Sequence, residues 1–134
     1  NTKKAALFFV FYLKQAGVEK IVLSDLARSD MAEVIEDAFR YDRMILMAPT
    51  YDAGLFPVME SFLHHLKAKN YCNRKIGLVE NGSWAPVGVK KMQEIIIEMK
   101  NISLEEKTVT ILSTLNETTE KELENLAKEM SVSS

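Results

Sequence analysis

Residues 43–48 are almost entirely apolar, and the run ends at Pro49. An apolar run of this length without polar alternation is typical of a strand inside a parallel sheet, because helices cover both of its faces. Pro57 then stands where a helix would begin, since the missing N–H of proline costs nothing in the first turn. We expect this helix to reach about residue 68. The centre of the sequence therefore predicts a buried strand followed by a helix.

The same alternation continues on both sides of this unit. Downstream we expect strands at 75–79 and 107–112 and helices at 87–99 and 119–130, with Thr119 and Glu122 at capping-box spacing. Upstream we expect a helix at 1–15 ended by Gly17, a strand at 18–23, and a helix from Asp30 to residue 39. The aromatic run 7–13 also suits a buried strand, and periodicity leaves that alternative open. Alternating strands and helices predict a doubly wound parallel sheet in a three-layer α/β/α domain covering 1–134.

Composition excludes several classes of function. The net charge is −2, and the 17 basic and 19 acidic residues are interspersed, so no basic stripe is present to bind nucleic acid. The longest apolar run, 5–13, is far shorter than the ~18 residues of a membrane span, so we expect a cytoplasmic protein with no membrane partner. Cys72 is the single cysteine, and the adjacent His64 and His65 point about 100° apart on a helix. No metal site is predicted.

Three segments are expected at the carboxyl ends of the strands, where open α/β sheets bind their ligands. Asn1 and Thr2 begin a helix, and unpaired N–H groups at a helix start favour an anion such as phosphate. The loop 49–56 carries a hydroxyl, an aromatic ring and a glycine. The loop 80–86 carries Trp84, the only tryptophan, beside a Gly-Ser pair. Two aromatic side chains on neighbouring loops suit the two sides of a flat ring.

In order and spacing, these three segments resemble the flavodoxin domain of the A-type flavoproteins, also called flavodiiron proteins. The resemblance covers essentially the whole chain, and it implies a flavodoxin-like fold that holds FMN. In that family a metallo-β-lactamase-like domain with a di-iron site precedes the flavodoxin domain, and none of that domain is present in this sequence. By resemblance, cofactor contacts fall to Asn1, Thr2, Pro49, Thr50, Tyr51, Asp52, Ala53, Gly54, Asn81, Gly82, Ser83, Trp84 and Ala85.

The resemblance implies an FMN-binding electron-transfer domain, not a complete enzyme, whose partner is a di-iron metallo-β-lactamase-like domain or another redox protein. The sequence also leaves open whether the chain forms a homo-oligomer. Two alternatives remain beside this reading. One is a flavodoxin-fold fragment without flavin that serves as an interaction module. The other is an NAD(P)H-dependent flavin or quinone reductase.

The flavodoxin-like strand order 2-1-3-4-5 places a first strand between 18–23 and 43–48. The sequence starts after the position of that strand, so we expect strand 1 to be missing and the phosphate loop to be cut short. Two strand spacings of ~4.8 Å would leave a gap of roughly 10 Å with unpaired backbone groups. A strand from a neighbouring chain, or the run 7–13, is an alternative filling. We therefore expect this chain, as given, to bind FMN weakly or not at all.

Overall fold

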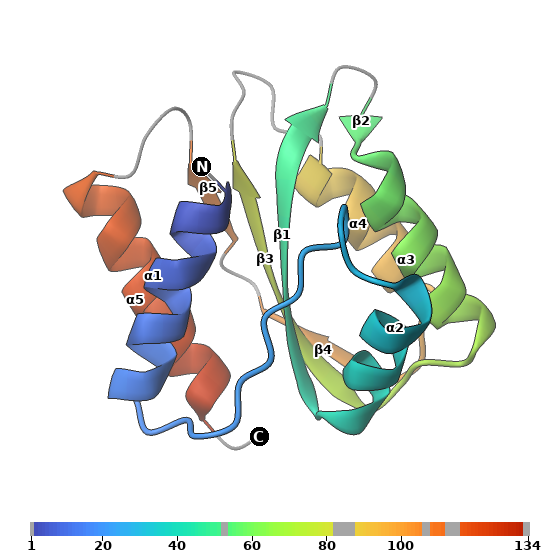
Figure 1. Cartoon of the computed structure of the whole chain (residues 1–134), viewed down its shortest axis with the longest axis horizontal. Coiled ribbons are helices and arrows are strands. Elements are labelled where there is room, and N and C mark those ends of the chain that lie inside the picture. The colour runs from blue at the N-terminus through green and yellow to red at the C-terminus, as the bar shows by residue number, and fades with distance from the viewer. Residues whose placement is uncertain (1, 52–53, 82–87, 106–107, 112–115, 133–134) are drawn as a thin grey trace.

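The computed structural model describes residues 2–51, 54–81, 88–105, 108–111 and 116–132. Its strands lie between two layers of helices (Figure 1). Helices α1 (Thr2–Gln15) and α5 (Glu117–Ser131) cover one face of the sheet. Helices α2 (Met31–Arg40), α3 (Pro57–Ala68) and α4 (Gly88–Ile96) cover the other. The predicted three-layer α/β class is confirmed.

The sheet is built around two long parallel strands. Strands β1 (Arg43–Tyr51) and β3 (Arg74–Asn81) pair in the register Arg43↔Lys75 to Pro49↔Asn81. On its other edge β3 pairs in parallel with β4 (Ile102–Leu104) and then with β5 (Val109–Ile111). The strand predicted at 107–112 corresponds to β5 at 109–111, whereas β4 was not predicted, so that edge is formed by two short strands in succession. A short strand β2 (Gly54–Leu55) pairs antiparallel with the end of β1.

The aromatic run 7–13 is helical, which settles the alternative that the sequence left open. Ala5 and Phe9 are one helical turn apart and are buried against α5 and the sheet. Gly17, at a φ of +95°, ends the helix as expected. The N–H of Val18 donates to the carbonyl of Leu13, and that of Gly17 to Lys14, which is the Schellman pattern. The composition of residues 7–13 suits a helix or a strand, and the packing of one apolar stripe favours the helix.

The expected strand at 18–23 is wrong. The segment belongs to no strand, and Val22 and Leu23 are about half exposed, at 47% and 53%. In Figure 1 it runs in front of β1 and in the same direction. A strand forms only when it has a neighbour to pair with, and no described strand lies between this segment and β1. The β-branched composition of this segment is therefore not sufficient to make it a strand.

The interpretation of Pro49 as the end of a strand is also wrong. Strand β1 continues through it to Tyr51, so the predicted loop 49–56 is instead the β1–β2 hairpin. The carbonyl of Asp42 accepts from the N–H of Lys75, so backbone groups of even-numbered residues in β1 face β3. The nitrogen of Pro49 faces away from β3, where the ladder needs no donor.

Most helix boundaries follow the sequence signals closely, although α4 ends at Ile96 and not at residue 99, and the capping of α2 and α5 differs from the sequence pattern. Helix α3 spans Pro57–Ala68 as predicted. Helix α2 has its N-cap at Asp30, although no side-chain hydrogen bond caps it. The capping box of α5 uses Asn116 and Thr119, not Thr119 and Glu122, because the side chain of Asn116 accepts from the N–H of Thr119 at 3.0 Å. This helix therefore begins at Glu117, two residues before Thr119.

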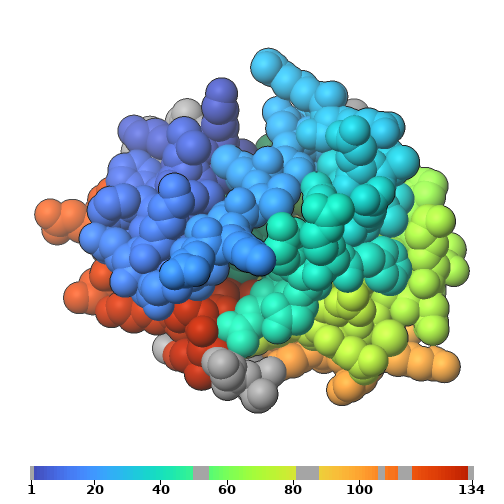
Figure 2. Space-filling model, turned by 60° about the horizontal axis from the view of Figure 1, so that its bottom comes forward, coloured from blue at the N-terminus to red at the C-terminus, as the bar shows by residue number. Residues whose placement is uncertain are grey.

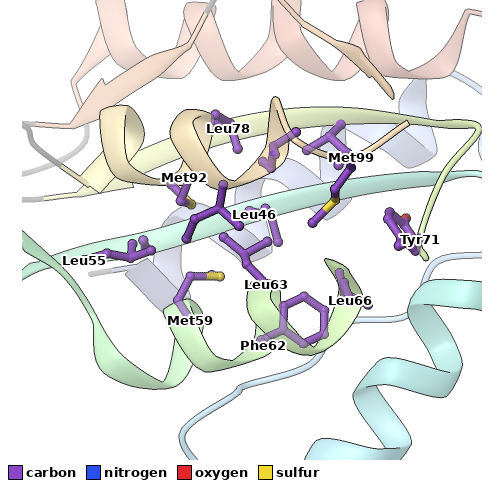
Figure 3. Close-up of a cluster of buried hydrophobic side chains, with 14 of the residues drawn as sticks. Leu46, Leu55, Met59, Phe62, Leu63, Leu66, Tyr71, Leu78, Met92 and Met99 are labelled. Atoms are coloured by element: carbon purple, nitrogen blue, oxygen red, sulfur yellow. The ribbon is translucent and has the colours of Figure 1, made fainter. Parts of the chain in front are cut away.

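Two apolar cores lie on the two faces of the sheet. The larger packs α2, α3 and α4 against β1 and β3, and Leu63 and Leu66 at its centre are completely buried (Figure 3). The smaller packs α1 and α5 against β3 and β5 around Phe9 and Leu123. Since both faces are covered, the strands need no polar side, as the unbroken apolar runs indicate.

At the amino edge of the sheet, Tyr71 is buried with 1% of its surface exposed, and Phe39 meets its ring edge-on. The guanidinium of Arg74 lies 4.9 Å from the Tyr71 ring centroid. Burial raises the pKa of Tyr71 to about 12, and Arg74 offsets part of this rise. Among the described residues the phenolic oxygen has no hydrogen-bond partner.

Candidate functional site

The three segments singled out by the sequence meet at the carboxyl edge of the sheet. Thr2, Pro49 and Phe56 line the same groove, although they come from α1, β1 and the start of α3. Pro49 is also the register partner of Asn81, the last residue of β3. The N-terminus of α1 lies at the end of the sheet toward which the β1 and β3 arrows point (Figure 1). The fold therefore brings residues from all three segments to one place.

The β1–β2 hairpin forms one wall of this edge. Thr50 pairs with Leu55 and Tyr51 with Gly54, so β1 extends beyond the point where parallel pairing ends. Phe56 follows directly as the N-cap of α3, with Pro57 at the first helical position. Because the chain leaves the hairpin straight into a helix, the backbone on either side of residues 52–53 is anchored by regular structure.

The start of α1 supplies the electrostatic character that an anion needs. No acidic residue stands in its first turn, and Lys3 and Lys4 are exposed beside Thr2. The first N–H groups of a helix carry partial positive charge and favour negative ligands. A phosphate at this position would meet the first backbone N–H groups of α1.

Glu80 is a site residue that the sequence reasoning missed, because it was assigned to the loop after β3. It lies inside β3 and is fully buried. Its Oε1 accepts a hydrogen bond from the backbone N–H of Val89 at 2.6 Å, at the start of α4. Oε2 has no hydrogen-bond partner among the residues that the structure describes. The sequence did contain a signal for this role. Glu80 is an acidic residue at the end of an apolar strand, and Gly88 stands at the start of the next helix.

Glu80 connects the two ends of the third predicted segment. Residues 82–87 lie between it and α4, and the Glu80 carboxylate holds the start of that helix against the end of β3. A β-carbon added at Gly88 would lie 2.6 Å from Oε1, so only glycine allows this approach.

The structure places some of the predicted contact residues and leaves others outside its description. Thr2, Pro49, Thr50, Tyr51, Gly54 and Asn81 lie at the carboxyl edge, on α1, the hairpin or the end of β3. Asn1, Asp52, Ala53, Gly82, Ser83, Trp84 and Ala85 lie outside the described residues. The ring-stacking role predicted for Trp84 therefore stays a prediction.

Within the described ranges, no group of three metal-ligating side chains is present. His64 lies 3.8 Å from the carboxylate of Glu60, one turn earlier on α3, and both side chains are about half exposed. His65 contacts the carbonyl of Ser61. The contacts of both histidines are thus with residues one turn earlier on the same helix. None of the described helices combines the length and the apolar character that crossing a membrane requires.

A parallel sheet between two helical layers, with these segments at its carboxyl edge, defines the flavodoxin-like class of fold, and solved structures bear this out. Rubredoxin oxygen:oxidoreductase from Desulfovibrio gigas matches 97% of this chain with a TM-score of 0.88 at 16% identity. The flavodiiron protein from Giardia intestinalis matches 97% with a TM-score of 0.85 at 17% identity. A flavodoxin from the domain Archaea matches 98% with a TM-score of 0.80 at 18% identity.

The matches differ in how much of the other protein they cover. This chain spans 32% of the length of the first two proteins and 88% of the archaeal flavodoxin. By sequence, the chain matches no protein-family model and no curated protein. At these identities the likeness establishes the fold.

Proposed function

We propose that this chain is an FMN-binding electron-transfer domain. The observation that supports the proposal is that the α1 N-terminus, the β1–β2 hairpin and the end of β3 lie at the carboxyl edge of the sheet, where Thr2 and Pro49 line one groove and Pro49 is the register partner of Asn81. Ligands of doubly wound sheets bind outside the carboxyl ends of the strands. Flavodoxins and a flavodiiron protein among the structural neighbours support a flavin in particular.

The donor set fits the parts of FMN. The first turn of α1, with Thr2, offers an anion site for the phosphate. The hairpin from Pro49 to Gly54 and the segment from Asn81 to Ala85 would lie on the two sides of the flavin ring, and Trp84 would stack on it. When bound, FMN supplies one- and two-electron transfer, and the protein orients the ring and excludes water.

The redox partner belongs to the same proposal. Two structural neighbours are about three times as long as this chain, which covers 32% of each. We propose that a di-iron metallo-β-lactamase-like domain, in the same protein or another one, exchanges electrons with the flavin. No described feature favours a flavin or quinone reductase over this reading.

A titration tests the proposal. The purified chain is titrated with FMN and, separately, with riboflavin, while the fluorescence of Trp84 and of the flavin is followed. Because we expect this chain, as given, to bind FMN only weakly, quenching of both signals should appear at high protein concentration, with FMN binding at least about tenfold more tightly than riboflavin since its phosphate interacts with the α1 N-terminus. If neither flavin is quenched at high protein concentration, the proposal is wrong.

Two further measurements sharpen the result. Thr2→Ala should weaken FMN binding severalfold and leave riboflavin binding unchanged, while Thr118→Ala, on the exposed first turn of α5, should change neither. An unchanged ratio of the two affinities in Thr2→Ala would contradict the assignment of the phosphate site. Oxidation of NADH by the flavin-loaded chain without any partner would instead favour the reductase.

A further inference from the structure

The side chain of Glu80 is fully buried on the face of the sheet that the larger core covers. Alternate residues of a strand point to the same face, and Ile76 and Leu78 of the same strand belong to that core. In register, Glu80 lies between Ala48 of β1 and Thr110 of β5. A carboxyl group is therefore enclosed by strands on both sides and by the start of α4 above it. Such burial is costly unless hydrogen bonds compensate for the lost water.

One hydrogen bond compensates for this burial and at the same time fixes the start of α4. The N–H of Val89 donates to Oε1 at 2.6 Å, and Oε2 has no partner among the described residues. The first N–H groups of a helix have no acceptor within the helix, and the first turn of α4 contains no acidic residue of its own. Glu80 thus caps α4 from a different element, and its side chain sets the position of this helix relative to β3.

Helix α4 in turn supports the β1–β2 hairpin. The helix contacts β2 directly, and Leu55 of β2 is buried in the same core as Met92 of α4 (Figure 3). Protein interiors are close-packed, so a displacement of α4 would be passed on to the hairpin. Glu80 therefore acts on two of the structures at the carboxyl edge. It belongs to the end of β3 itself, and it reaches the hairpin through α4.

The helix proposed to hold the phosphate lies on the other face of the sheet. Helix α1 packs with α5 in the smaller core, whereas Glu80 faces α4. Figure 2 shows α1 (dark blue) beside α5 (red), with α3 (green) on the opposite side of the molecule. A change at Glu80 should therefore disturb the hairpin and the end of β3, and leave the first turn of α1 as it is.

We propose that Glu80 is a positioning residue for the flavin ring. Its hydrogen bond to Val89 holds α4, and through α4 the β1–β2 hairpin, in place beside the end of β3. Groups that contact a ligand bind it well only when the residues behind them are locked. The net contribution of one hydrogen bond corresponds to a change in affinity of about threefold to tenfold. This inference rests on the proposed function.

Hydrogen exchange on the full chain without flavin tests the first step. In Glu80→Ala, exchange should become at least about tenfold faster at Val89 and about threefold faster in β2 and at the end of β1. Glu80→Gln keeps a carbonyl oxygen as acceptor and should exchange like the original chain. Glu94→Ala removes an exposed carboxylate from the same helix and is the matched control, which should change neither region. If the exchange of β2 is the same in Glu80→Ala as in the original chain, the inference is wrong.

Titration with FMN and with riboflavin at high protein concentration tests the second step. Glu80→Ala should weaken the binding of both flavins by the same factor, about threefold to tenfold, because the two ligands share the ring. The ratio of the two affinities should stay that of the original chain, in contrast to Thr2→Ala. Glu80→Gln should keep both affinities within about twofold. A loss confined to FMN, or a loss in Glu80→Gln as large as in Glu80→Ala, would overturn the positioning role.

The proposed function and this inference fail in different ways. If the original chain binds neither flavin, the proposed function is wrong and the inference falls with it. If the original chain and Glu80→Ala bind both flavins equally well, only the inference is wrong. Gly88→Ala provides a second route should Glu80→Ala not fold, because its β-carbon would displace the start of α4 from an intact carboxylate. It should also weaken both flavins by one common factor, and unchanged affinities in this variant would contradict the inference.

Discussion

The Oε1 atom of Glu80 lies 2.6 Å from the backbone nitrogen of Val89, and this hydrogen bond joins the end of β3 to the start of α4. The carboxylate is fully buried, and Gly88 leaves the space that it occupies. A buried carboxyl group is tolerated only where hydrogen bonds or a favourable dipole compensate for lost water. The burial of Glu80 therefore depends on its hydrogen bond to the start of α4. We expect the effects of substitutions at Glu80 and Gly88 on stability to be coupled.

A double-mutant cycle tests this dependence. Gly88→Ala should destabilise the chain by about 1–3 kcal/mol, because its β-carbon would stand 2.6 Å from Oε1. In a Glu80→Ala background the same change should cost nothing or stabilise slightly, since alanine favours a helix. Urea unfolding of the four proteins gives the coupling energy, which we expect at about 1–3 kcal/mol. Simple additivity would show that the carboxylate does not occupy this position.

The capping box of α5 predicts a second pair of outcomes. Asn116→Ala should cost about 1 kcal/mol, because the N–H of Thr119 loses its acceptor. Thr119→Ala should cost a similar amount, since its hydroxyl accepts from the N–H of Asn116 at 2.9 Å. Thr118→Ala, one position away and exposed, is the control and should cost at most a few tenths of that value. Equal losses at Thr118 and Thr119 in thermal unfolding would contradict the assigned cap.

Tyr71 predicts a loss of stability in alkaline solution. An unfolded tyrosine ionises near pH 10, whereas the pKa of the folded residue is about 12. Between these values the unfolded state binds fewer protons, so stability falls as the pH rises, by up to about 2–3 kcal/mol in total. Below pH 10 tyrosine is protonated in both states, so the stability is not reduced by this effect.

Comparison with Tyr71→Phe isolates the effect. The variant keeps the ring against Phe39 and removes a hydroxyl that has no partner among the described residues. It should be as stable as the original chain at pH 7 and more stable above pH 10. Denaturant unfolding at pH 8 and pH 11 provides the measurement, and parallel losses in both proteins would assign the alkaline effect to other groups.

The larger core predicts the cost of a cavity. Leu63→Ala should destabilise by about 2–5 kcal/mol, because Leu63 is completely buried between α3 and the sheet (Figure 3). Leu7→Ala, which removes a leucine side chain that is 53% exposed on α1, is the matched control and should cost less than about 1 kcal/mol. Calorimetric unfolding distinguishes the two. Similar costs would mean that Leu63 does not lie at the centre of the core.

Local signals predicted much of this fold. Pro57 marks the first residue of α3, and Gly17 follows the last turn of α1 in the left-handed conformation. The apolar runs at 43–48 and 75–79 lie within β1 and β3, which pair in parallel. These features were predictable because each depends on a backbone preference or on a repeat of apolar residues within one segment.

The candidate site was predictable in its location and less so in its parts. The rule for parallel sheets predicted Thr2, Pro49 and Asn81 at one edge; Pro49 is the register partner of Asn81, and Thr2 and Pro49 line one groove, while their role in cofactor binding stays a prediction. Glu80 was missed because its role requires knowing that the start of α4 returns to the end of β3. The contact joins Glu80 to Val89, nine residues apart, and no periodic pattern in the sequence predicts it.

The sequence by itself determined the class of fold, because strand and helix periodicity and helix ends are properties of short segments. Tertiary structure decided the rest. The run 7–13 became a helix because one stripe of it packs on α5, and residues 18–23 stayed outside the sheet because no described strand pairs with them. Pro49 continues a strand because its nitrogen lies on the edge that faces the groove. Pairing and packing join distant segments, so their outcome depends on which neighbours the whole chain provides.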